Sequence, residues 1–135
     1  MAEEPITVLY DDDCGFCRWS ADMLRRWDRR GGLRFATIQS RTGDSLLADL
    51  DLVERLASWH VVTPDGRRRS AGDAVAPTLE RLPGGWPLAR LAELAPSLTD
   101  VAYRGVARRR STLGRLLGTQ ACAVDPARPR DHDAA

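Results

Sequence analysis

The sequence predicts an α/β domain in which a β-α-β unit is followed by a helix, a β-hairpin and another helix. Short β-branched runs alternate with amphipathic segments as far as Leu82, which is typical of strands that alternate with helices. Asp65-Gly66 separates two strand-like segments and favours a tight hairpin turn. A chain of 135 residues is long enough to bury one hydrophobic core without disulfides or metal ions to stabilise it.

The first β-α-β unit has clear boundaries in the sequence. Ile6–Tyr10 is an apolar strand, and Leu33–Ile38 alternates as a second strand. Between them lies a predicted helix whose apolar residues recur at spacings of three and four: Phe16, Trp19, Met23, Leu24 and Trp27. Gly31-Gly32 ends that helix.

The second half of the predicted core begins with a helix capped by Thr42 or Asp44. Its inner face carries Leu46, Leu47, Leu50, Val53 and Leu56. Ser58–Val62 then forms a third strand, and Arg67–Ser70 pairs with it through the hairpin. A last core helix runs from Gly72-Asp73 to about Leu82, with Pro77 as a candidate for its first turn.

A helical extension from about residue 84 completes the expected single domain, residues 1–124. The loop around Gly84-Gly85-Trp86-Pro87 precedes a short helix over Leu88–Leu94. Ser97 is expected to cap a longer amphipathic helix that reaches Leu117. Residues 125–135 are rich in Pro, Arg, Asp and Ala and are expected to form a disordered tail.

The composition excludes several classes of protein. The 20 basic residues, all arginine, nearly balance 19 acidic residues, so no global field favours nucleic acid or a membrane surface. The acidic N-terminus resembles no signal peptide, and no apolar run approaches the length of a membrane span. Three cysteines do not make a disulfide framework. We expect a cytoplasmic protein that is monomeric by default.

The best functional lead is the segment Asp11-Asp12-Asp13-Cys14-Gly15-Phe16-Cys17, where a strand passes into a helix. The N–H groups and dipole at a helix N-terminus favour thiolate formation, whereas neighbouring carboxylates oppose it. We expect Cys14 to be the exposed attacking thiolate and Cys17, one turn on, the buried resolving thiol. Asp11 either relays a proton or bonds loop N–H groups.

The order of elements and the position of the C-x-x-C pair are those of a thioredoxin-like domain. Asp11-x-x-Cys14-x-x-Cys17 resembles the D-x-x-C-x-x-C signature of the DCC family of predicted thiol-disulfide oxidoreductases. Asp65-Gly66, Trp86-Pro87-Leu88-Ala89 and Tyr103-x-x-Val106-Ala107-x-x-Arg110 resemble the same family. The resemblance implies a thioredoxin-like fold and dithiol chemistry at Cys14 and Cys17.

One departure concerns the residues before the third strand. Thioredoxins and glutaredoxins resemble one another in a proline there, usually cis, whereas this chain has Leu56-Ala57-Ser58 and its nearest proline, Pro64, follows the strand. The docking of an extended peptide beside Cys14 is therefore expected to differ.

Three other functions compete with this interpretation. A zinc site could join Cys14 and Cys17 to Cys122 and to His60 or His132, but the second paired motif of a structural zinc site is absent. Asp11-x-Asp13 after a strand also resembles a haloacid-dehalogenase phosphatase, but that chemistry usually needs a lysine and the chain has none. A non-catalytic thioredoxin-like adaptor, docking through the Trp86 loop, is the third.

The remaining conspicuous residues have both a functional and a structural interpretation. Cys122 could form a mixed disulfide with Cys14 or act as a regulatory thiol, but packing or an idle thiol is the simpler role. Arg67–Arg69 and Arg108–Arg110 are interpreted as solvated faces, and His60 as a half-buried strand residue. The four tryptophans are expected to be core or groove anchors.

Taken together, the sequence predicts a thiol-disulfide oxidoreductase of the protein-disulfide reductase type. Its expected substrate is a disulfide-containing protein or a small thiol, with a cellular reductant to recycle the Cys14–Cys17 disulfide. We expect no metal or organic cofactor, no nucleic acid and no membrane partner.

Overall fold

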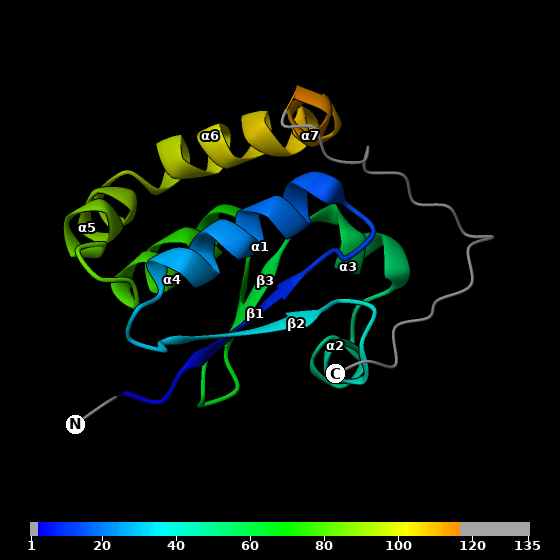
Figure 1. Cartoon of the computed structure of the whole chain (residues 1–135), viewed down its shortest axis with the longest axis horizontal. Coiled ribbons are helices and arrows are strands. Elements are labelled where there is room, and N and C mark those ends of the chain that lie inside the picture. The colour runs from blue at the N-terminus through cyan, green and yellow to red at the C-terminus, as the bar shows by residue number, and fades with distance from the viewer. Residues whose placement is uncertain (1–2, 117–135) are drawn as a thin grey trace.

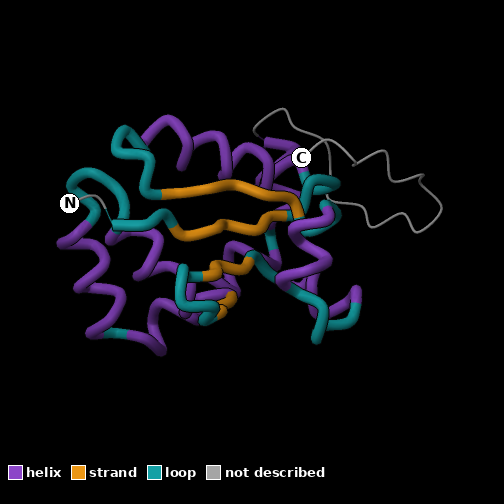
Figure 2. Tube along the Cα trace, turned by 90° about the horizontal axis from the view of Figure 1, so that it is seen from below, coloured by secondary structure: helices purple, strands orange, loops and turns teal. Residues whose placement is uncertain are grey.

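The apolar run Ile6–Tyr10 forms β1, a central strand of a four-stranded sheet with the order β2-β1-β3-β4. A computed structural model of the chain describes residues 3–116. β1 pairs parallel with β2 (Leu33–Thr37) and antiparallel with β3 (His60–Val62). β4 (Arg68–Ser70) pairs antiparallel with β3 through the predicted Asp65-Gly66 turn, where Gly66 has a φ of +85°. Figure 2 shows helices on both sides of this sheet.

The crossover from β1 to β2 is α1 (Gly15–Trp27), which lies along one face of the sheet (Figure 1). Its end is fixed by Asp28, whose carboxylate accepts the backbone N–H groups of Gly32 and Leu33, both at 2.9 Å. Gly31 adopts a φ of +67°, which glycine tolerates best. The helix therefore ends at Trp27, with Asp28 as its C-cap, before the predicted end at Gly31-Gly32.

The single helix predicted over Leu46–Leu56 is wrong, because this region forms two short helices. α2 (Arg41–Leu46) is capped by Ser40 rather than by Thr42 or Asp44, and α3 (Leu52–Ala57) is capped by Asp51. The Asp51 carboxylate accepts the N–H of Glu54 at 2.8 Å, and Glu54 accepts the N–H of Asp51 at 3.1 Å. This reciprocal capping box starts a new helix at Leu52 and breaks the apolar periodicity.

After β4 the chain forms a 3₁₀ turn, η1 (Ala71–Ala74), and then α4 (Val75–Glu80). The helix predicted from Gly72 to Leu82 is therefore divided and ends two residues earlier. Pro77 lies in the first turn of α4, where a missing backbone N–H costs no helical hydrogen bond.

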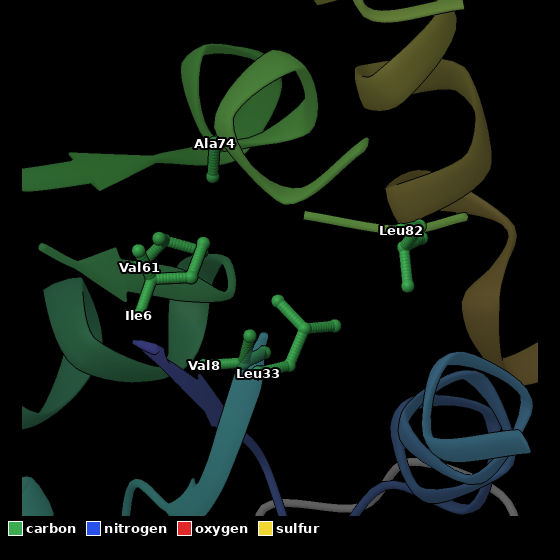
Figure 3. Close-up of a cluster of buried hydrophobic side chains, with 6 residues drawn as sticks. All are labelled: Ile6, Val8, Leu33, Val61, Ala74 and Leu82. Carbon is green, nitrogen blue, oxygen red and sulfur yellow. The ribbon is translucent and has the colours of Figure 1, made fainter. Parts of the chain in front are cut away.

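Two apolar clusters hold the helices to the sheet. Ile6, Val8, Leu33, Val61, Ala74 and Leu82 form the cluster beneath α1 and α4 (Figure 3). Leu9, Ile38, Leu47, Leu56 and Val62 form the cluster on the opposite face, beneath α2 and α3. Alternate residues of β1 therefore enter opposite cores, so a one-residue shift of its register would exchange them.

The extension forms α5 (Trp86–Leu94), α6 (Pro96–Arg108) and α7 (Arg110–Leu116). The predicted Ser97 cap is wrong: the N-cap is Ala95, two residues earlier, so α6 starts at Pro96 and has no side-chain cap hydrogen bond. The helix is also interrupted at Arg109, so the region in which one long helix was expected to reach Leu117 forms two helices, α6 and α7. α6 packs on η1, where a Cβ added to Gly72 would lie 2.8 Å from Asp100 Cα, and α7 packs against α1.

The sheet order and the succession of core elements are those of a thioredoxin-like α/β fold, as predicted, with two short helices instead of one between β2 and β3. None of the helices between residues 3 and 116 is long and apolar enough to cross a membrane. The predicted tail, residues 125–135, and the end of the predicted domain at residue 124 lie outside the described residues.

Candidate functional site

Cys14 and Cys17 lie where β1 passes into α1, as the sequence predicts. Cys14 is the N-cap of α1 and has an extended backbone, and its Sγ accepts the backbone N–H of Cys17 at 3.3 Å. Because Cys17 is the third helical residue, this contact occupies one of the donors that a helix start leaves without an intrahelical partner. A negative charge on Cys14 would be stabilised by the same N–H and by the helix dipole.

The exposure of the two sulfurs is the reverse of the expected order. Cys14 is disulfide-bonded in this structure and its side chain is fully buried, whereas Cys17 carries a free thiol and is partly exposed. The expectation failed because the side chain of an N-cap residue turns back over the helix end. The C-x-x-C pair is therefore adjacent in space but not closed into a disulfide with itself.

The Cys17 thiol is held in its protonated form. Burial raises the pKa of Cys17 from 9.0 to about 11, and the nearby Asp11 charge also raises it. The Arg110 charge opposes this rise, as do hydrogen bonds to Cys17 from the Arg110 side chain and the Asp11 backbone. Near neutral pH the residue is thus a neutral thiol with a cation beside it.

Asp11, the last candidate from the sequence, is buried behind this pair and is 4% exposed. Its Oδ1 accepts the backbone N–H of Asp13 at 2.9 Å and the side-chain amide of Gln39 at 2.7 Å. The Gln39 carbonyl oxygen in turn accepts the N–H of Asp12 at 3.1 Å. Asp11 therefore bonds the loop, and Gln39, which follows β2, is a supporting residue that the sequence did not reveal.

Arg110 and Tyr103 complete the surroundings of Cys17 from the C-terminal helices. Arg110 donates from Nη1 to the Leu56 carbonyl at 3.2 Å, in addition to its contact with Cys17. The Tyr103 hydroxyl accepts the backbone N–H of Trp59 at 3.3 Å, and burial raises the Tyr103 pKa. The interpretation of Arg108–Arg110 as a solvated face is thus wrong for Arg110, although Arg108 and Arg109 are exposed.

A pocket of about 880 Å³ opens beside these groups. Asp11, Cys17 and Arg110 line it, and most of its remaining wall is apolar. The large aromatic and aliphatic side chains of that wall are Tyr10, Phe16, Trp19, Met23, Leu24, Trp27, Trp59 and Tyr103. Three of the four tryptophans therefore line a groove, while Trp86 does not line it and is 63% exposed on α5.

The residues considered for a zinc site are not gathered around Cys14 and Cys17 in the described part of the chain. His60 is buried in β3, where Nδ1 lies 2.6 Å from Ser70 Oγ and Nε2 lies 2.9 Å from the Arg55 carbonyl, so both ring nitrogens have partners. Within residues 3–116 no three His, Cys, Asp or Glu side chains are grouped as metal ligands. Cys122 and His132, the other ligands of the considered zinc site, lie outside the described residues.

Comparison with known proteins identifies the relatives of this chain. Residues 8–116 match the family described as DCC1-like thiol-disulfide oxidoreductase, which confirms the resemblance seen in the sequence. YuxK of Bacillus subtilis (strain 168) is 28% identical over 104 residues, which cover 76% of each chain. No solved structure matches the chain. Since the match spans the sheet, the C-x-x-C pair and all three helices of the extension, the chain belongs to the DCC1-like thiol-disulfide oxidoreductase family.

Proposed function

We propose that this protein exchanges thiols and disulfides through a Cys14–Cys17 couple, with Cys14 as the attacking sulfur and Cys17 as the resolving one. The observation that carries the proposal is the hydrogen bond from the Cys17 N–H to Cys14 Sγ at the start of α1. That contact stabilises a thiolate on Cys14, whereas burial keeps the neighbouring Cys17 protonated. The two sulfurs thus differ in environment. Because Cys14 is fully buried in this disulfide-bonded form, the proposal requires that reduction makes its sulfur accessible to the substrate.

In the reductive direction, the reaction begins with both cysteines reduced. The Cys14 thiolate attacks one sulfur of a substrate disulfide, forms a Cys14–substrate disulfide and releases the other sulfur as a thiolate, which takes up a proton. Cys17 then loses its proton, attacks Cys14 Sγ and releases the second substrate thiol. The substrate gains two electrons and two protons, the Cys14–Cys17 disulfide forms, and a cellular thiol reductant restores the pair.

The proton on Cys17 makes the second step the demanding one. With a pKa of about 11, only about one Cys17 in 3,000 is a thiolate at pH 7.5. Asp11 is the buried carboxylate whose charge acts on Cys17, so we assign to it the acceptance of that proton. If Asp11 accepts this proton, the Asp11→Asn variant should slow resolution more than it slows the initial attack by Cys14, even though loss of the Asp11 charge by itself lowers the Cys17 pKa.

Poising the protein in defined glutathione buffers, followed by thiol trapping and peptide mass mapping, tests the couple directly. We expect a reversible loss of two hydrogens that maps to Cys14 and Cys17. Metal content measured on the same sample tests the zinc alternative. Two thiols that never pair, or stoichiometric zinc, would refute the proposal.

Substitution of one cysteine at a time, in a Cys122→Ser background, tests the order of attack. Cys17→Ser should accumulate a mixed disulfide on Cys14, whereas Cys14→Ser should accumulate far less under the same conditions. The adaptor alternative has one observation in its favour, since Trp86, Leu91 and Leu94 on α5 are 63%, 63% and 83% exposed. An adaptor would keep its partner binding in the Cys14→Ser variant, while a redox enzyme would lose all turnover.

A further inference from the structure

The pocket beside Cys17 has the size and walls of a small-molecule site. Its volume of about 880 Å³ falls within the range of roughly 300–1,000 Å³ that such sites occupy. Trp19 and Met23 of α1 and Val106 of α6 line it and remain 38%, 44% and 45% exposed. Large apolar side chains left open around one hollow mark a surface that binds an apolar group.

The charges around the pocket are placed at two ends. Asp11, Cys17 and Arg110 line the pocket near the start of α1, and Arg26 and Arg29 line it near the other end of that helix. Nine residues separate Cys17 from Arg26, which corresponds to about 14 Å along the helix axis. Arg26 has no ion-pair partner within residues 3–116, unlike Arg25, which pairs with Asp22 at 2.7 Å.

The backbone just before β3, with which an extended peptide would pair, already forms a hydrogen bond to α6. Ser58 is extended and leads into β3, and the next N–H, that of Trp59, donates to the Tyr103 hydroxyl of α6. Figure 1 shows α6 running alongside α1 on this side of the sheet. A peptide that paired with the backbone just before β3 would have to displace Tyr103, whereas a compact ligand between α1 and α6 would not.

We propose that this pocket selects the substrate, and that the substrate is a low-molecular-weight disulfide with an apolar body and an anionic far end. The inference rests on the proposed function. The substrate disulfide lies at the Cys17 end of the pocket, next to Cys14. The apolar body lies against Trp19 and Met23, and the anion lies near Arg26 and Arg29. The exchange chemistry is the one given above and needs no further reactant.

The first test compares disulfides that differ in one property at a time. The disulfide of 11-mercaptoundecanoate has about the required length, that of 3-mercaptopropanoate lacks the apolar body, and that of 11-mercaptoundecyl-trimethylammonium reverses the end charge. All are used below their aggregation concentrations, beside insulin as a protein disulfide. We expect kcat/KM for the long acid to exceed that for the short acid about tenfold or more.

Matched variants connect that preference to the pocket. Trp19→Ala should remove most of the preference for the long acid, whereas Trp86→Ala, which changes an exposed tryptophan outside the pocket, should leave it unchanged. Arg26→Gln should reduce kcat/KM for the long acid about threefold and not for the trimethylammonium probe. Arg34→Gln, at an exposed position of β2 outside the pocket, is the matched control.

A binding measurement that involves no redox chemistry separates the proposal for the pocket from the proposed thiol-disulfide exchange. Calorimetric titration of the Cys17→Ser variant with undecanoate should show binding that Trp19→Ala weakens. If the protein reduces short and long disulfides equally, or insulin faster than any of them, the pocket inference is overturned while the proposed function stands. If the protein reduces none of the disulfides, the proposed function fails, and with it the substrate assignment.

Discussion

Arg110 should set the rate at which Cys17 resolves the mixed disulfide. Its charge and its hydrogen bond both lower the Cys17 pKa against the larger effect of burial. In the Arg110→Gln variant the charge is lost and the hydrogen bond weakened, which should raise the Cys17 pKa by about one unit and reduce the thiolate about tenfold. The remaining thiolate is about threefold more nucleophilic, because reactivity rises with basicity. The net expectation is resolution about threefold slower at neutral pH.

The assay isolates that step. Cys14 is loaded with thionitrobenzoate in a Cys122→Ser background, and the coloured thiol is released as Cys17 attacks. The rate should rise with pH towards the Cys17 pKa, with the midpoint displaced upwards in Arg110→Gln and largely restored in Arg110→Lys.

A purely structural role for Arg110 makes a different prediction. The Arg110 bond to the Leu56 carbonyl would be lost or weakened without moving the midpoint of the pH profile. An unchanged midpoint in Arg110→Gln would therefore refute the electrostatic reasoning. Equal defects in the Gln and Lys variants would refute it as well.

Three further predictions concern stability and pairing. Because folding raises the Cys17 pKa from 9.0 to about 11, its stabilising effect is complete below pH 9 and is lost as the pH rises to 11. Urea unfolding of reduced protein should show a loss of up to about 3 kcal/mol across that window, smaller in Cys17→Ser. The Gly43→Ala variant should lower the free energy of unfolding by about 1–3 kcal/mol, because the added Cβ would overlap the Ile38 carbonyl. The Gly105→Ala variant, in α6 with open space around it, should raise the free energy of unfolding by up to about 1 kcal/mol, and thermal unfolding measures both. The mixed disulfide between Cys122 and Cys14 remains a sequence-based prediction. Peptide mapping under non-reducing conditions should recover a Cys14–Cys122 peptide that is lost in the Cys122→Ser variant. Recovery of Cys122 as a free thiol would refute this pairing.

The sequence predicts the local parts of this fold well. β1 is set by an adjacent signal, a β-branched run, and lies as expected. α1 ends at Trp27, before the pair of glycines that was expected to stop it. The break between α2 and α3 also has a local signal, the Asp51-x-x-Glu54 capping box, but the leucine periodicity across it favoured one helix. Caps compete with periodicity, and here the cap prevailed.

The site is less accessible to sequence reasoning because its parts are remote in the chain. Cys17 and Arg110 are separated by 93 residues, and only the packing of α7 against α1 brings them together. The motif that ends at Arg110 was visible as a family resemblance, yet nothing in its residue types connected it to a thiol. The pocket likewise depends on how far α6 stands from α1, which no local pattern encodes.

The close approach of α6 to Gly72 connects a position in η1 with the pocket wall, because α6 contributes to both. Any side chain at position 72 would press on Asp100 and push that end of α6 outwards. Six residues further along, about 9 Å by helical rise, Val106 forms part of the pocket wall. A methyl group at position 72 is therefore expected to alter the pocket wall at Val106 without changing any residue that lines the pocket.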